Sequence, residues 1–185
     1  MANEEKNSIF KVAFNLIAAC FISGCVIGVV YFVTAPVAAQ KAEIMKQESM
    51  KSLVPEAETF KEVQGKDKWF TAEKAGKTIA YVVPGESKGY GGAIKMLVAV
   101  TPDGKVIDYS ILAHNETPGL GDNASKPAFR DQFKGKGSEQ LVVVKDKSKV
   151  DNIQAMTGAT ISSRAVTKAV KGSVDEVVAF TGGKK

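Results

Sequence analysis

Hydrophobic and polar positions divide the chain into an apolar N-terminal stretch and a polar, patterned remainder. No charged residue lies between Lys11 and Lys41, and the core of this interval, Val12 to Val33, is almost wholly apolar. A helix rises about 1.5 Å per residue, so a run of this length crosses the roughly 30 Å hydrocarbon core of a bilayer. We therefore predict one transmembrane helix over residues 12–34, after a short N-terminal segment, 1–11.

A cleaved signal peptide is the alternative interpretation of the apolar run, because Val37-Ala38-Ala39 is an acceptable cleavage site. However, the run exceeds the roughly 7–15 apolar residues of a signal peptide, and Glu4 and Glu5 dilute the basic segment before it. The sequence therefore favours an uncleaved anchor.

Small side chains recur within the predicted span. Cys20, Gly24 and Gly28 are spaced four residues apart, which places them on one helix face. This spacing is either a surface for packing against another helix or a chance result of the glycine content of membrane helices. Both cysteines, Cys20 and Cys25, lie in the span, so the polar part has no disulfide and no thiolate metal site.

Beyond the span, a charged helical segment precedes a mixed domain. Pro36 marks a change of character, after which residues 38–53 carry charges and a weak apolar face. We predict a stalk helix over residues 35–55 and a folded domain over residues 56–185. The net charge of +5 comes from separated lysines without an arginine cluster, which indicates a solvated surface and not a nucleic-acid interface.

The domain begins with strand patterns. Thr78 to Val83 is a β-branched and aromatic run that we expect to end at Pro84-Gly85. Ile94 to Val100 and Val106 to Leu112 predict a hairpin, because Thr101-Pro102-Asp103-Gly104-Lys105 between them contains the turn-forming Asp-Gly pair.

The second half of the domain changes from extended to helical periodicity. Ala113 to Ser125 is aperiodic, and long loops of this kind tend to be functional. Residues 124–133 predict a short helix, 140–144 a strand and 150–156 a last extended segment. From Ser163 to Phe180 the apolar residues keep to one helical face. The fold class predicted is α+β, with an antiparallel sheet, packed helices and one transmembrane helix before them.

A hydroxyl-rich turn, Thr157-Gly158-Ala159-Thr160-Ile161-Ser162-Ser163, stands where the amphipathic helix begins. Backbone N–H groups at a helix N-terminus lack intrahelical partners, so a phosphate can bind there. Threonine and serine before a helix are also ordinary N-caps. The spacing alone leaves both interpretations open.

The aperiodic loop contains a second candidate, His114-Asn115-Glu116-Thr117-Pro118-Gly119-Leu120-Gly121. Its histidine invites a metal or nucleophile hypothesis. A single histidine without nearby thiols does not make a common zinc site, and no G-x-S-x-G elbow supports a hydrolase. His114 stays unassigned.

Together with Gly89-Tyr90-Gly91-Gly92 and Leu53 to Ala57, these two loops resemble the FMN-binding domain of the Rnf-type G subunit. The same domain occurs in the C subunit of sodium-translocating NADH:quinone reductase. The resemblance covers nearly the whole chain, and the E-T-P-G-L-G loop with T-G-A-T is highly specific. The short chain and the G-Y-G-G-A-I-K run after Lys88 favour the Rnf form. The alternatives are the quinone reductase protein and a flavin-free, membrane-anchored assembly protein.

The resemblance implies an electron-relay subunit with FMN joined to Thr160 by a phosphoester bond, installed by a flavin transferase. Its complex would couple ferredoxin and NAD oxidation-reduction to ion translocation, with the other subunits as partners and the domain on the extracytoplasmic side of the membrane. No residue is expected to act as a catalytic acid or base. The transferase pattern usually has aspartate where this chain has Gln154, which leaves the acceptor threonine in place. The residues assigned to the flavin are Tyr90, Gly91, Gly92, Glu116, Thr117, Pro118, Gly119, Leu120, Gly121, Thr157, Gly158, Ala159, Thr160, Ser162 and Ser163.

Overall fold

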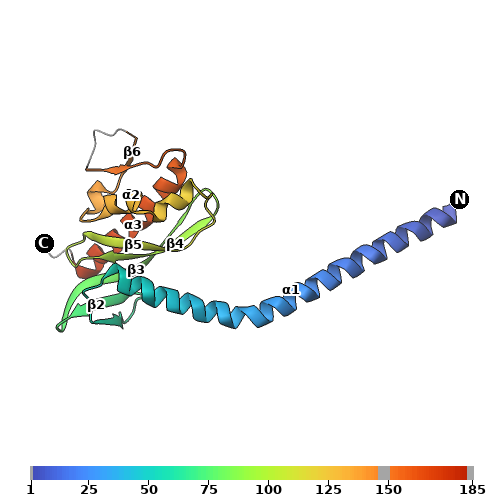
Figure 1. Ribbon diagram of the computed structural model, residues 1–185, viewed down its shortest axis with the longest axis horizontal. Helices are drawn as coiled ribbons and strands as arrows, with labels where there is room; N and C mark the ends of the chain where they lie inside the picture. Colours follow the sequence, from blue (N-terminus) through green and yellow to red (C-terminus); the bar gives the residue numbers. More distant parts are fainter. Residues whose placement is uncertain (1, 146–150, 183–185) are drawn as a thin grey trace. The chain divides into compact units, whose positions relative to one another are not determined.

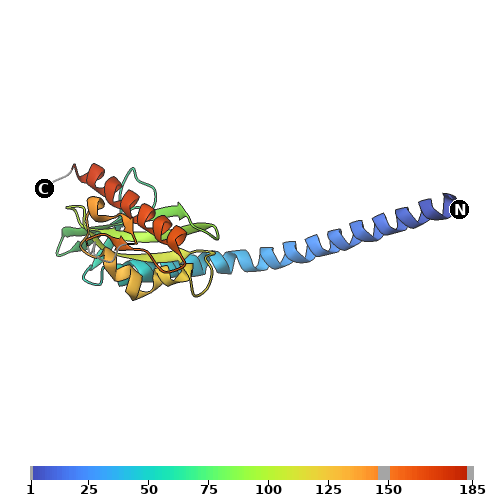
Figure 2. The same cartoon turned by 90° about the horizontal axis from the view of Figure 1, so that it is seen from above.

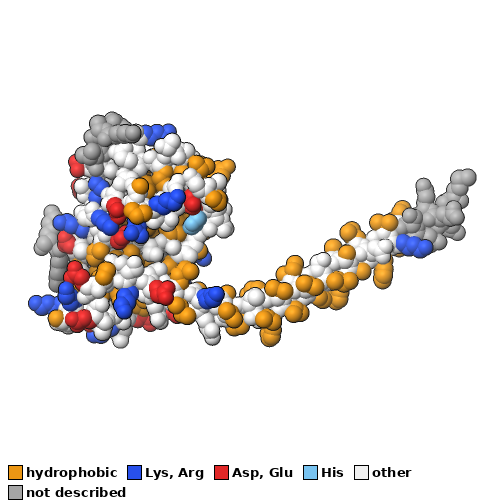
Figure 3. Space-filling model, in the orientation of Figure 1, with side chains coloured by type: hydrophobic (Ala, Val, Ile, Leu, Met, Phe, Trp, Pro, Cys, Tyr) orange, Lys and Arg blue, Asp and Glu red, His pale blue; other side chains and the backbone are white. Residues whose placement is uncertain are grey.

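The computed structural model describes residues 2–145 and 151–182, and the chain separates into two compact units between Ile44 and Met45. Helix α1 (Ala2–Leu53) continues through Pro36. Its apolar stretch is long enough to cross a membrane, and none of that stretch is buried within the described chain. Figure 3 shows apolar side chains along this helix. The predicted apolar helix is confirmed, while the bounds of the span, stalk and domain stay predictions.

The second unit is built on a five-stranded antiparallel sheet whose strands follow chain order (Figure 1). Its strands are β1 (Thr59–Glu62), β2 (Phe70–Lys74), β3 (Lys77–Lys88), β4 (Ala93–Val100) and β5 (Val106–Ala113). The β4–β5 hairpin and its turn confirm the sequence prediction. Strands β1 and β2 were not predicted, because they are short and carry too few β-branched residues to give a strand pattern.

The predicted end of a strand at Pro84-Gly85 is wrong, because β3 runs on to Lys88. Its pairing with β2 stops at Val82, while its pairing with β4 continues to Lys88. Beyond Val82 one edge of β3 therefore has no partner strand in the described chain. Proline is tolerated at such an edge because no ladder donor is required there.

Both faces of the sheet are covered. This explains why the sequence of β4 is apolar at nearly every position. One face packs against helix α3 (Thr160–Thr181), whose buried Val166 and Val170 contact the cluster that includes Met96 and Val98. The other face, with Leu97, packs against the end of α1 through Met50 and Leu53. Figure 2 shows α3 lying along the sheet. Side chains alternate across a strand, so a strand covered on both sides must be apolar throughout.

Short elements connect the sheet to α3. They are η1 (Gly121–Ser125), α2 (Pro127–Arg130), η2 (Asp131–Phe133), η3 (Ser138–Gln140), β6 (Val143–Val144) and β7 (Ile153–Gln154). The helix predicted over 124–133 is thus divided into three turns. The strand predicted over 140–144 is reduced to β6, which pairs in parallel with β7. Residue 150 of the predicted last strand lies outside the described residues.

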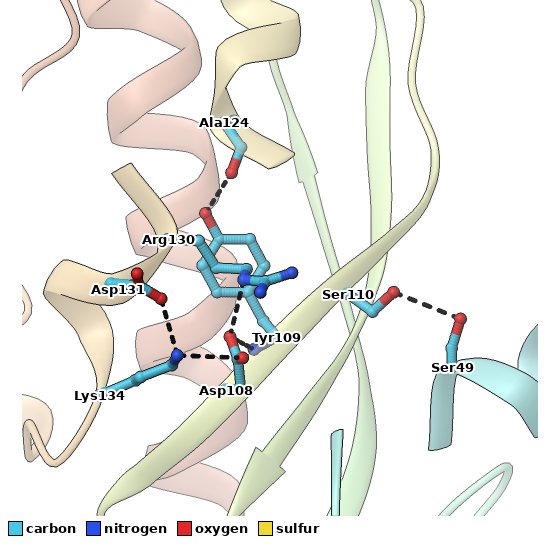
Figure 4. Close-up of polar contacts among 8 residues, drawn as sticks. All are labelled: Ser49, Asp108, Tyr109, Ser110, Ala124, Arg130, Asp131 and Lys134. Atoms are coloured by element: carbon cyan, nitrogen blue, oxygen red, sulfur yellow. Dashed lines mark hydrogen bonds and ion pairs between the residues drawn. The ribbon is translucent and has the colours of Figure 1, made fainter. Parts of the chain in front are cut away.

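A polar network fixes η1 and α2 against β5 (Figure 4). The buried Tyr109 hydroxyl donates to the Ala124 carbonyl at 2.5 Å. Asp108 forms ion pairs with Arg130 at 3.3 Å and with Lys134 at 3.7 Å. Burial raises the pKa of the Tyr109 phenol well above its ordinary range, so the group stays a hydrogen-bond donor. This network holds in place the end of the aperiodic loop and the short helices that follow it.

Candidate functional site

The two candidate loops meet at one pocket of about 490 Å³. This volume falls within the roughly 300–1,000 Å³ that is typical of small-molecule sites. The lining residues are Tyr90, Glu116, Thr117, Leu120, Gly121, Gly158, Ala159, Thr160, Ile161 and Ser162. They come from the β3–β4 turn, the loop after β5, and the first turn of α3. Three sequence segments far apart in the chain therefore form a single site.

The N-terminus of α3 forms one side of this pocket. The helix begins at Thr160, and no side chain of the described residues caps it. The first N–H groups of a helix have no intrahelical acceptor and carry a partial positive charge, which favours an anion. Gly158 precedes them with a φ of +75°, a conformation that glycine adopts without steric cost.

The Ser163 side chain stabilises this turn from inside. Its hydroxyl donates to the Ala159 carbonyl at 2.9 Å and accepts the Met156 N–H at 3.0 Å. The side chain is fully buried. Ser163 thus shapes the hydroxyl-rich turn without lining the pocket.

Glu116 connects the pocket's three segments. Its side chain is 6% exposed. The carboxylate accepts hydrogen bonds from the Gly91 N–H at 2.9 Å and from the Ser162 hydroxyl. The Glu116 N–H in turn donates to Nδ1 of His114 at 3.1 Å. His114, unassigned from the sequence, therefore orients the Glu116 backbone.

Exposed apolar side chains surround the mouth of the pocket. Tyr90 is 72% exposed, Ile161 55% and Leu120 43%. Such surfaces suit a flat, largely apolar ring system, while the start of α3 suits a phosphate. Ile161 lines the pocket but was not among the residues predicted from the sequence. Its position between Thr160 and Ser162, both predicted, was the signal that could have identified it.

Some of the predicted residues lie outside the pocket lining. Pro118 and Gly119 are exposed in the loop, and Gly91 and Gly92 belong to the β3–β4 turn without lining the pocket. Thr157 lies in a neighbouring hollow of about 380 Å³. The two threonines of T-G-A-T therefore face different environments.

In the described ranges, 2–145 and 151–182, no group of histidine, cysteine, aspartate and glutamate side chains is arranged to hold a metal ion. The pocket instead offers backbone amides, hydroxyls, apolar edges and the carboxylate of Glu116. This donor set fits a phosphorylated aromatic cofactor.

Comparison with known proteins agrees with this geometry. Residues 89–175, which include all three pocket segments, match the FMN-binding domain family. The chain is 62% identical to the G subunit of the proton-translocating ferredoxin:NAD⁺ oxidoreductase complex of Clostridium ljungdahlii, over 98% of both chains. The chain belongs to the G-subunit family of ion-translocating oxidoreductase complexes.

Other members of the G-subunit family are more distant. The Na⁺-translocating ferredoxin:NAD⁺ oxidoreductase complex of Acetobacterium woodii has a G subunit that is 31% identical over 90% of each chain. The G subunit of the Methanosarcina acetivorans complex is 30% identical, with 96% of this chain and 99% of that one covered. Among solved structures, the C subunit of the Na⁺-translocating NADH-quinone reductase of Parabacteroides distasonis superimposes with a TM-score of 0.53. It is 27% identical, over 63% of each chain. The α+β fold is thus shared with the quinone reductase protein, while the sequence places the chain in the G-subunit family.

Proposed function

We propose that this chain is the electron-relay subunit of a membrane-bound ferredoxin:NAD⁺ oxidoreductase that is coupled to ion translocation. The 62% identity to a G subunit of such a complex and the FMN-binding domain support this function. Bound FMN supplies electron transfer, and the protein supplies position and electrostatics. The residues of the pocket therefore need to hold and orient the flavin, and none needs to act as an acid or base.

We further propose that FMN is joined to Thr160 by a phosphoester bond. The observation that carries this proposal is that Thr160 lines the pocket at the first residue of α3, while Thr157 does not. Thr160 is half-buried, and no described hydrogen bond uses its hydroxyl as a cap. A phosphate esterified here keeps a negative charge, and the positive N-terminal end of α3 stabilises that charge.

The remaining pocket residues would hold the ring. Tyr90, Leu120 and Ile161 offer apolar surfaces, and Thr117 offers a hydroxyl. Gly121 and Gly158 allow the backbone to approach closely, because neither carries a side chain. No polar group in this set has to transfer a proton.

A flavin transferase would install the cofactor. Gln154, at the position where the transferase pattern usually has aspartate, shares the hollow beside the pocket with Thr157. Its backbone N–H is held by the Gln132 side chain at 2.7 Å. We propose this hollow as the surface that the transferase contacts, with Thr160 next to it as the acceptor.

Intact mass and fluorescence test the covalent bond. The full chain, produced together with a flavin transferase, is expected to gain the mass of one FMN, less water, and to fluoresce in a denaturing gel. Thr160→Ala removes both signals because the acceptor oxygen is gone. Thr59→Ala is the matched control, because this exposed threonine of β1 lines neither the pocket nor the neighbouring hollow.

Fragmentation of the wild-type peptide that ends at Arg164 then assigns the adduct to one hydroxyl. An adduct on Thr157 or Ser162, or a dark wild-type band without added mass, would refute the bond at Thr160. A dark band would also favour a flavin-free assembly role.

The membrane arrangement is a related proposal. We propose that residues 12–34 span the cytoplasmic membrane, residues 35–55 form a stalk, and residues 56–185 form the FMN domain on the extracytoplasmic side. Other subunits would contact the span and the flavin domain. Gly24 and Gly28 support a helix contact, because a side chain added at either would meet nothing within 4 Å among the described residues. A C-terminal alkaline phosphatase fusion that is inactive, while a cytoplasmic reporter is active, would overturn the sidedness.

A further inference from the structure

Glu116 is the buried charged side chain of the pocket, and both of its carboxylate oxygens accept hydrogen bonds. Oε1 accepts from the Gly91 N–H at 2.9 Å, and Oε2 accepts from the Ser162 hydroxyl. An ionised carboxylate has acceptors only, and each of these oxygens accepts one hydrogen bond from the protein. Its oxygens therefore point to the protein segments on either side of the loop.

Three glycines lie where a side chain would collide with this carboxylate or with the backbone next to it. A Cβ at Gly89 would lie 2.3 Å from Oε1, and one at Gly121 would lie 2.5 Å from Oε2. A Cβ at Gly91 would lie 1.8 Å from the carbonyl oxygen of Asn115, next to Glu116. The glycines of the β3–β4 turn and of the loop thus make room for the glutamate itself, besides any room they make for a ligand.

Hydrogen bonds, and not an ion pair, compensate this charge. Over the residues that the structure describes, no lysine, arginine or histidine forms an ion pair with Glu116. A buried charge is costly unless hydrogen bonds compensate it, and here two donors do so. These neutral donors stabilise the carboxylate without cancelling its net charge, so this wall of the pocket keeps a negative charge.

We infer that Glu116 is a positioning residue: its carboxylate joins the β3–β4 turn, the loop and the start of α3, and its negative charge makes the bound flavin harder to reduce. The inference rests on the proposed flavin site. It differs from the assignment of Glu116 as a direct contact to the ring, because each carboxylate oxygen is turned to a protein donor, Gly91 on one side and Ser162 on the other.

The joining role is measured without flavin, by hydrogen exchange of the full chain in detergent in a Thr160→Ala background. Glu116→Ala removes the acceptor of the Gly91 N–H, so exchange of this amide is expected to rise about fivefold or more. Glu116→Gln keeps an acceptor oxygen and is expected to restore protection. The exposed Glu176→Gln, on α3, is the matched control.

The charge is measured by reductive titration of the flavin-loaded full chain. Glu116→Gln retains the geometry and removes the charge, so the equilibrium constant for reduction is expected to rise about tenfold. Glu176→Gln is expected to leave it unchanged. If the role of Glu116 were only structural, Glu116→Gln would keep Gly91 protected and would leave the reduction equilibrium unchanged as well.

Distinct outcomes refute the inference and the proposed function. Unchanged Gly91 exchange in Glu116→Ala overturns the joining role, and an unchanged potential in Glu116→Gln overturns the charge role. If Glu116→Ala fails to fold, unchanged Gly91 exchange in Glu116→Met, which keeps the side-chain length but has no carboxylate acceptor, overturns the joining role instead. A wild-type chain that carries no flavin refutes the proposed function, while the exchange experiment still decides the joining role.

Discussion

Replacing Gly91 by alanine places a methyl group against the backbone of the flavin-site loop. The new Cβ would lie 1.8 Å from the Asn115 carbonyl oxygen, whereas real Cβ contacts stay above 3.0 Å. The obstacle is backbone, so it does not move aside as the end of a side chain would. The turn and the loop must separate by more than an ångström, which also breaks the 2.9 Å hydrogen bond from the Gly91 N–H to Glu116.

The cost of Gly91→Ala has two parts. Overpacking typically costs about 1–3 kcal/mol, and loss of a hydrogen bond to a charged group costs about 1.5–3 kcal/mol. After partial relaxation we expect the free energy of unfolding to fall by about 3 kcal/mol, which lowers Tm by roughly 10 °C for a domain of this size. Flavin loading should fall as well, because the pocket opens.

Gly119→Ala is the matched control in the same loop. Gly119 has a φ of +77° and open space around its Cβ position, so alanine there meets strain without a clash. We expect a loss of only about 1 kcal/mol.

Fluorescence of Trp69, the single tryptophan and a buried core residue of the domain, follows unfolding of the unflavinylated chain. Equal losses of stability in the two variants, or a wild-type Tm for Gly91→Ala, would refute the steric reasoning.

Three further predictions concern the network behind the loop. Tyr109→Phe leaves the buried Ala124 carbonyl without its donor at 2.5 Å and should cost about 1–3 kcal/mol in thermal unfolding; no change in Tm would contradict it. Because the pKa of Tyr109 is raised in the folded protein, the protonated phenol contributes its full stabilisation below about pH 10. This stabilisation is lost as the pH rises further, so wild type should lose more stability at high pH than the variant does. A hydrogen bond from Lys134 at 2.7 Å lowers the pKa of Asp131. The small contribution of this pair to folding stability is present above about pH 4 and is lost as the pH falls through the lowered pKa. Lys134→Met should therefore raise the pKa of Asp131 in a carboxyl NMR titration, and an unmoved titration would exclude the pair.

Much of the fold was predictable because local patterns specified it. The apolar run of α1, the β4–β5 hairpin with its Asp-Gly turn, and the amphipathic α3 each carry a clear periodicity. Strands β1 and β2 were missed because their stability comes from pairing with β3 and not from their own composition. The path of β3 through Pro84 was predicted wrongly, since only the sheet shows that this edge of β3 has no partner strand among the described residues.

The site followed the same division. By itself the sequence determined which loops carry the glycines, hydroxyls and carboxylate, and the resemblance of those loops to an FMN-binding domain. The tertiary structure alone decided that Glu116 turns inward to Gly91 and Ser162, and that Thr160 lines the pocket while Thr157 lies in the neighbouring hollow. The physical reason is that a motif fixes chemical groups along one chain, whereas burial and hydrogen bonding depend on segments that only folding brings together.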